Sequence, residues 1–156
     1  MPRSELTLDA LVLTLCADDG WLHAGTVAET IEHAEHHRGE DAGDHGPDRV
    51  DFFDVTGRRL EPVVGHDLVV RGFVPASGRP APARVKARVN AVLDRAEVYL
   101  EAHPGGTGRP WPAGRTVPRP NGSLADVVER LRASTRQLDQ GHAAGWFHNL
   151  LHAIGV

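Results

Sequence analysis

The stretch from residue 83 to 102 limits the possible folds more than any other part of this sequence. Apolar side chains recur there at helical spacing and form one face, made by Val85, Val89, Val92, Leu93, Ala96, Tyr99 and Leu100. An amphipathic helix of this length is stable in a folded protein only when its apolar face packs against another layer. The remainder of the chain must therefore supply a surface for this helix to cover.

Three short β-rich runs precede this helix and predict that surface. The runs are separated by turns at Thr56-Gly57 and Gly65-His66, and they cover residues 50–55, 58–64 and 67–74. We expect a three-stranded antiparallel meander with one face covered by helices. Pro62 lies within the second run and cannot donate to a strand ladder, so we expect this strand to be interrupted or unpaired there.

Two helices are predicted before the meander. The first covers residues 6–17, where Leu8, Leu11, Val12 and Leu15 recur at helical spacing. A buried strand is the alternative for this segment, because few of its positions are polar. The second helix is expected from about His23 to Arg38, and a loop rich in aspartate and glycine follows it.

The C-terminal part begins with an irregular stretch, residues 103–122, which holds five prolines and five glycines. Two further helices are predicted at 123–139 and 142–154. They are too short to fold alone, so we expect a single domain over residues 1–156, with no boundary at the Pro/Gly-rich loop. The predicted fold class is α+β: two N-terminal helices, a three-stranded antiparallel meander, then three helices packed on it.

Composition and charge exclude several classes of protein. Cys16 is the only cysteine, so no internal disulfide can form, and a lone thiol is typical of a reducing compartment. No run has the pattern of a signal peptide or a membrane span, so a cytoplasmic protein is expected. The net charge is −4, and every basic residue except Lys86 is arginine, a bias typical of a GC-rich bacterial genome. Such a chain is a poor candidate for nucleic-acid binding.

Ten histidines are more than a chain of this length ordinarily holds. On the predicted second helix, Glu29, His33 and His36 share one face, and His37 lies one turn after His33. Imidazoles at this spacing, with a carboxylate on the same face, can hold zinc or another divalent transition metal. The sequence therefore indicates Glu29, His33, His36 and His37 as candidate metal ligands. The alternative is a solvated polar face.

The run from His33 to Glu40, HAEHHRGE, resembles the metal-binding helix of DinB-like four-helix-bundle proteins. The resemblance covers eight residues and concerns the local geometry of this helix alone. It implies that His33 and His37 are ligands, with a third ligand from another helix. His148 and His152, on the predicted last helix, form a second pair with the same spacing. Packing against the rest of the domain is the alternative interpretation of that pair.

The Pro/Gly-rich loop is the candidate partner-binding site. Trp111 lies between two prolines, and three arginines give the loop local positive charge, namely Arg109, Arg115 and Arg119. Tryptophan and arginine are common anchors of interfaces, and prolines reduce the entropy that a segment loses on docking. The alternative is that this loop is a connector between helices and that its tryptophan packs on the core.

No complete catalytic motif is present, since the sequence lacks a Gly-x-Ser-x-Gly elbow, a phosphate loop and an HExxH zinc motif. Residues 8–31 resemble the first two helices of a winged-helix domain, with the later strands as its wing. The main hypothesis is a small non-enzymatic accessory protein that acts through a protein partner. The alternatives are a metal-binding protein or metal-dependent enzyme that uses the histidine cluster, and a winged-helix-like regulator.

Overall fold

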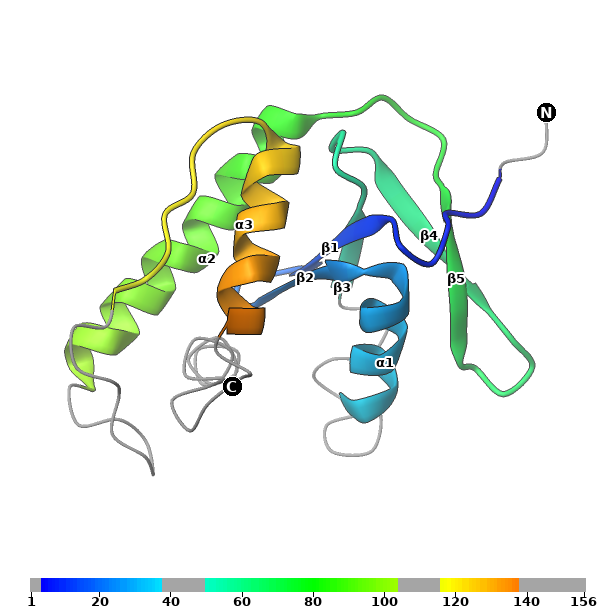
Figure 1. Ribbon diagram of the computed structural model, residues 1–156, viewed down its shortest axis with the longest axis horizontal. Helices are drawn as coiled ribbons and strands as arrows, with labels where there is room; N and C mark the ends of the chain where they lie inside the picture. The colour runs from blue at the N-terminus through cyan, green and yellow to red at the C-terminus, as the bar shows by residue number, and fades with distance from the viewer. Residues whose placement is uncertain (1–3, 38–49, 104–115, 138–156) are drawn as a thin grey trace.

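A five-stranded antiparallel sheet with the strand order β2-β1-β3-β4-β5 forms the centre of the computed structural model (Figure 1). The structure describes residues 4–37, 50–103 and 116–137, with the side chains at 35–37 and 135–137 excepted. The strands are β1 (Leu11–Cys16), β2 (Leu22–Thr26), β3 (Val50–Phe53), β4 (Arg59–Val64) and β5 (Val70–Pro75). The helices are α1 (Val27–His37), α2 (Pro82–Ala102) and α3 (Leu124–Gln137).

The α+β class is confirmed, but the predicted order of elements is wrong at the N-terminus. The predicted first helix is the strand β1, as the alternative interpretation of that segment had it, and the start of the predicted second helix is the strand β2. Helices cover β1 on both faces, so neighbouring positions such as Val12 and Leu13 are both buried. A strand of this kind is an almost continuous apolar run that periodicity cannot distinguish from a buried helix. Without a first helix, the helix–turn–helix interpretation is wrong as well.

The predicted meander is confirmed as β3, β4 and β5, and β3 joins it to β1. Pro62 does not interrupt β4, because Pro62 still pairs with Phe73 of β5. On the other side, β3 pairs with β4 only at Phe52–Leu60 and Phe53–Arg59, so pairing ends before Pro62 as expected. The outer part of the β4–β5 hairpin, residues 62–73, thus continues beyond β3 as a two-stranded extension, which we call the β4–β5 arm.

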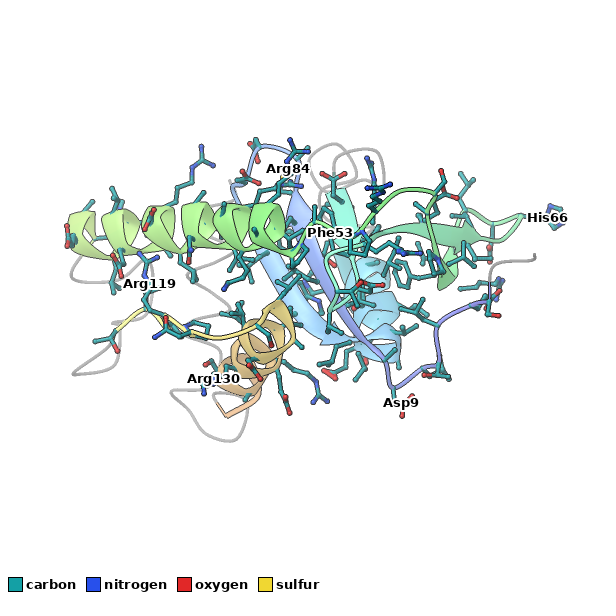
Figure 2. All side chains as sticks on the ribbon, turned by 90° about the horizontal axis from the view of Figure 1, so that it is seen from above. Asp9, Phe53, His66, Arg84, Arg119 and Arg130 are labelled. Atoms are coloured by element: carbon teal, nitrogen blue, oxygen red, sulfur yellow. The ribbon has the colours of Figure 1, made fainter. Side chains whose placement is uncertain are left out.

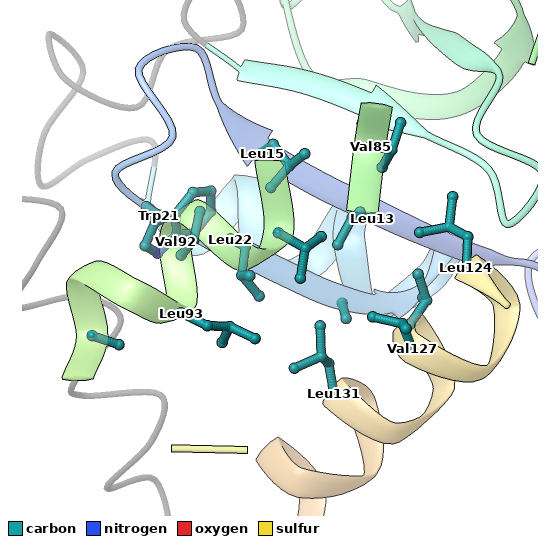
Figure 3. Packing of buried hydrophobic residues seen from close by; sticks show 14 of the residues in the cluster. Leu13, Leu15, Trp21, Leu22, Val85, Val92, Leu93, Leu124, Val127 and Leu131 are labelled. Carbon is teal, nitrogen blue, oxygen red and sulfur yellow. The ribbon is translucent and has the colours of Figure 1, made fainter. Parts of the chain in front are cut away.

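Helices cover both faces of the sheet and create two cores. α2 and α3 pack on one face, where the apolar stripe predicted for residues 83–102 is buried with residues of β1, β2 and α3 (Figure 3). α1 packs on the opposite face, over a smaller cluster of Val12, Val27, Phe52, Leu60, Val70 and Phe73. Because α1 contacts both edge strands, β2 and β5, the sheet must curl around it.

The turn between β3 and β4 positions the start of α2. Gly57 has a φ of +83°, and a Cβ atom there would lie 2.6 Å from the backbone nitrogen of Pro82. The amide of Ala81 donates a hydrogen bond to the carbonyl of Gly57 at 3.0 Å. Only glycine tolerates both this φ and this approach. The β3–β4 turn and the first turn of α2 are therefore in direct contact.

The helices predicted at 83–102 and 123–139 are confirmed as α2 and α3, within a residue or two at each end. The helix predicted at 142–154 lies outside the described residues, so the single-domain prediction stays a prediction. Within the described ranges, no helix is both long enough and apolar enough to cross a membrane.

Candidate functional site

Glu29, one of the candidate metal ligands, caps the start of α1. The amide of Glu29 donates to Oγ1 of Thr26 at 3.2 Å, and the Thr26 hydroxyl donates to Oε1 of Glu29 at 3.1 Å. The amide of Thr26 also donates to this carboxylate at 3.4 Å. Threonine and glutamate at this spacing form a capping box, which satisfies amides that the helix itself leaves unpaired. The Thr-x-x-Glu pattern was visible in the sequence, but the predicted helix began too early to use it.

The Glu29 carboxylate also binds α3. Nη2 of Arg132 lies 2.7 Å from Oε1 of Glu29, and Nε of Arg132 donates to the same oxygen at 2.8 Å. Burial alone would raise the pKa of Glu29, but the hydrogen bonds from Arg132 and Thr26 outweigh it and hold that pKa below its usual range. Glu29 is therefore an ionised group that connects α1 to α3, and its oxygens are occupied by donors within the protein.

His33 lies in a stack of three rings. The centroid of its imidazole lies 4.1 Å from the centroid of the His23 ring, with 20° between the ring planes. It lies 5.0 Å from the centroid of the Trp21 ring, with 18° between the planes. We call Trp21, His23 and His33 the imidazole stack. Nothing in the sequence indicated that Trp21 and His23 are neighbours of His33, because the strand β2, which contains His23 and begins directly after Trp21, was predicted as part of a helix.

The stacked geometry does not resemble a shared metal site. A metal lies in the plane of each imidazole that ligates it, because the nitrogen lone pair lies in that plane. Two nearly parallel rings 4.1 Å apart direct their lone pairs along planes that do not converge at bonding distance. Among the described side chains, no three or more potential ligands gather around one point. His36, His37, His148 and His152 lie outside the described side chains, so the metal site stays a prediction.

Thr14 is a buried polar residue on the α1 face of the sheet, next to His23 of the imidazole stack. Thr14 pairs with His23 of β2 on one side and with Phe52 of β3 on the other. Alternation along β1 turns Thr14 toward α1, together with Val12. The Thr14 side chain is 4% exposed, and its hydroxyl has no hydrogen-bond partner among the described residues. A buried hydroxyl of this kind is uncommon in an otherwise apolar layer.

Of the candidate partner-binding residues, the structure describes only Arg119. Its guanidinium lies 2.6 Å from a carboxylate oxygen of Asp94 and 2.9 Å from one of Glu97, both on α2. The hydrogen bond that Arg119 donates to Glu97, and to a lesser extent the one that it donates to Asp94, hold the pKa of Arg119 above its usual range. Arg119 thus attaches the segment before α3 to α2, as Figure 2 shows. Trp111, Arg109 and Arg115 lie outside the described residues.

The tip of the β4–β5 arm, residues 64–69, was not singled out by the sequence analysis. Figure 2 shows His66 at the outer end of the arm, away from α2 and α3. The amide of Leu68 donates to the carbonyl of Gly65 at 3.0 Å, and the amide of Gly65 donates to the carbonyl of Val69 at 3.0 Å. These bonds close a three-residue loop whose last residue adopts a left-handed conformation, which glycine ordinarily provides.

Leu68 occupies this left-handed position. Its φ is +63°, and its side chain is 72% exposed. Val64, at the same end of the arm, is 41% exposed. Asp67 accepts a hydrogen bond from the amide of Val69 and pairs with Arg71 at 3.1 Å, so the charges beside Leu68 compensate each other. The tip therefore presents apolar side chains on a closed turn of little net charge.

No protein-family model, no curated protein and no solved structure matches this chain.

Proposed function

We propose that this chain is a small accessory protein that binds a protein partner through the tip of the β4–β5 arm. The observation that carries the proposal is Leu68, an exposed leucine in a left-handed backbone conformation. For a bulky residue such a φ is an outlier, and outliers of this kind concentrate at functional positions.

Leu68 contributes little to the stability of the described fold. A left-handed conformation costs a residue with a Cβ atom about 1–2 kcal/mol, which glycine would avoid. The exposed side chain recovers none of this cost by burial. Folding alone therefore favours glycine or asparagine at this position, and contact with another molecule is the simplest reason for leucine.

The chemistry of the tip favours an apolar pocket on the partner. Complete burial of a leucine side chain stabilises a complex by about 1.5–3 kcal/mol. Val64 would extend the apolar contact, and the pair of Asp67 and Arg71 leaves little charge to steer association. We therefore expect binding that depends weakly on salt, with Leu68 as the central anchor.

A site-specific cross-link tests this proposal. p-Benzoylphenylalanine is placed at position 66, beside Leu68, and separately at position 98 on α2, where Val98 is 67% exposed. After irradiation of cells that produce the protein, position 66 should give a discrete cross-linked species that is absent from position 98. The species should disappear when Leu68→Gly is added. The proposal is wrong if both positions give the same species, or if the species survives Leu68→Gly.

A further inference from the structure

A second surface lies at the end of the β4–β5 hairpin opposite the tip, where three segments meet. These are the β3–β4 turn, the loop after β5 and the first turn of α2. The contact of Gly57 with Ala81 and Pro82 joins the turn to the helix. The amide of Ala76 donates to the carbonyl of Arg59 at 2.9 Å and holds the loop beside the turn. Side chains from the three segments therefore share one end of the molecule.

Each of these segments contributes an arginine: Arg58, Arg79 and Arg84. None of the three forms an ion pair with any residue that the structure describes. We call these three arginines the basic end. Figure 2 shows Arg84 at the start of α2, far from Arg119 and Arg130. The basic end therefore carries positive charge that the described part of the chain does not compensate.

Two neighbouring arginines, unlike the three of the basic end, form ion pairs. Nε of Arg88 lies 2.6 Å from Asp19 and its Nη1 lies 3.0 Å from Asp51, while Nη2 donates to the carbonyl of Cys16. Arg59 pairs with Asp51 at 2.9 Å. Arg88 therefore joins α2 to the β1–β2 turn and to β3, and Arg59 joins β4 to β3. Asp19 and Asp51 are thus already engaged by these two arginines, while Asp54 accepts hydrogen bonds from Thr56 and from the backbone amide of Arg58.

The charges of α2 run against the dipole of the helix. Its first turn contains no acidic residue, and its N-cap, Ala81, provides no side-chain hydrogen bond. Its last turn contains no basic residue, and its acids, Asp94, Glu97 and Glu101, lie in the second half. A helix is stabilised by the opposite arrangement. The stability of α2 therefore does not explain an arginine in its first turn.

We infer that the basic end binds a carboxylate-rich segment of another protein. Guanidinium groups hold carboxylates through paired, charge-assisted hydrogen bonds, and three arginines suit a short acidic segment. A nucleic acid fits less well, since its run of phosphates requires an extended basic surface, and this chain of net charge −4 offers three arginines bordered by Asp19, Asp51 and Asp54. This inference does not depend on the proposed role of Leu68, because the basic end lies at the opposite end of the hairpin.

Titration with a fluorescent ten-residue glutamate peptide tests the inference on the full chain. Arg84→Glu is compared with Arg130→Glu, which makes the same change of charge at an exposed position on α3. At low salt we expect the unaltered protein and Arg130→Glu to bind alike, and Arg84→Glu to bind about fivefold more weakly. Binding should fall as salt rises to 0.5 M.

Three results would overturn the inference: no binding of the peptide at low salt, equal weakening by both substitutions, or tighter binding of a single-stranded oligonucleotide than of the peptide. Arg84→Glu removes charge that opposes the helix dipole, so its thermal midpoint should not fall. A loss of peptide binding with an unchanged or raised midpoint therefore reports the surface and not unfolding. The cross-link from position 66 should persist in this variant, which separates the two proposals.

Discussion

Two helix N-termini in this protein are built in opposite ways. At α1, the capping box of Thr26 and Glu29 and the carbonyls of Leu8 and Ala10 accept the first amides, and Glu29 supplies a negative charge. At α2, no side chain caps the helix, and Arg84 places a positive charge in its first turn. The arrangement at α1 stabilises the fold, whereas the arrangement at α2 places a destabilising charge on an exposed surface. Leu68 resembles the start of α2, because it too is an exposed residue that lowers the stability of the fold.

The largest effect should come from breaking the stabilised end. Glu29→Ala removes the capping box and leaves the half-buried Arg132 without this partner, so we expect a loss of about 2 kcal/mol in the free energy of unfolding. Urea denaturation followed by circular dichroism measures it. Asp126→Ala, which removes the corresponding cap of α3 but no interhelical ion pair, should cost clearly less. Equal losses would show that the bond to Arg132 contributes nothing.

The same contact should make stability depend on pH. Because the pKa of Glu29 is held below its usual value of about 4.5, its contribution is complete above that pH and is lost as the pH falls through the lowered value. The difference in stability between the unaltered protein and Glu29→Gln should therefore be constant near pH 6–7 and shrink below pH 4. A difference that stays constant down to pH 3 would contradict the lowered pKa.

At the arm, replacing Leu68 with a residue that tolerates the left-handed conformation should stabilise the protein. Leu68→Gly relieves the left-handed strain, and after the added flexibility of the unfolded chain we expect a gain of about 0.5–1 kcal/mol. Leu68→Asn, which also tolerates this conformation, should give a similar gain. Thermal unfolding measures both, with Val98→Thr as an exposed control of similar helix propensity that relieves no such strain. If both Leu68 substitutions destabilise the protein, Leu68 supports the fold and the functional interpretation fails.

The smallest effect should come from α2. Arg84→Glu replaces an unfavourable charge with a favourable one in the first turn, so we expect a gain of about 0.5 kcal/mol. Arg130→Glu, near the middle of α3, should give no such gain. Thermal unfolding at low and at high salt separates the two, because salt screens the interaction with the dipole. A gain of the same size in both variants would point to net charge instead.

The sequence predicted those elements whose pattern is local. The stripes of α2 and α3 have one covered face, and the runs at residues 50–74 alternate with clear turns, so both were found. β1 is covered on both faces, and β2 carries His23 and Thr26 among its apolar residues, so neither has a clear period. Their identity as strands depends on pairing with each other and with β3, which lies beyond α1 in the sequence.

The candidate site shows the same division. The shared face of Glu29 and His33 followed from helical spacing alone. The partners that decide their roles come from elsewhere: Arg132 lies 103 residues after Glu29, and the ring of His23 reaches His33 from a strand. The left-handed φ of Leu68 arises from closure of the hairpin, and no residue type in the loop indicates this conformation. Periodicity therefore predicts which residues share a helix face, but it does not predict which residues of other elements pack against that face.

Pro62 has a consequence for the behaviour of the protein at high concentration. The hydrogen bonds at either end of β4 show that alternate residues face β3, and Pro62 is one of these. A strand edge with free amides is a template on which a second chain can add a strand and begin an aggregate, and a proline removes the amide that such growth requires. The arm can therefore extend from the sheet and present Leu68 without offering this edge as a seed for fibrils.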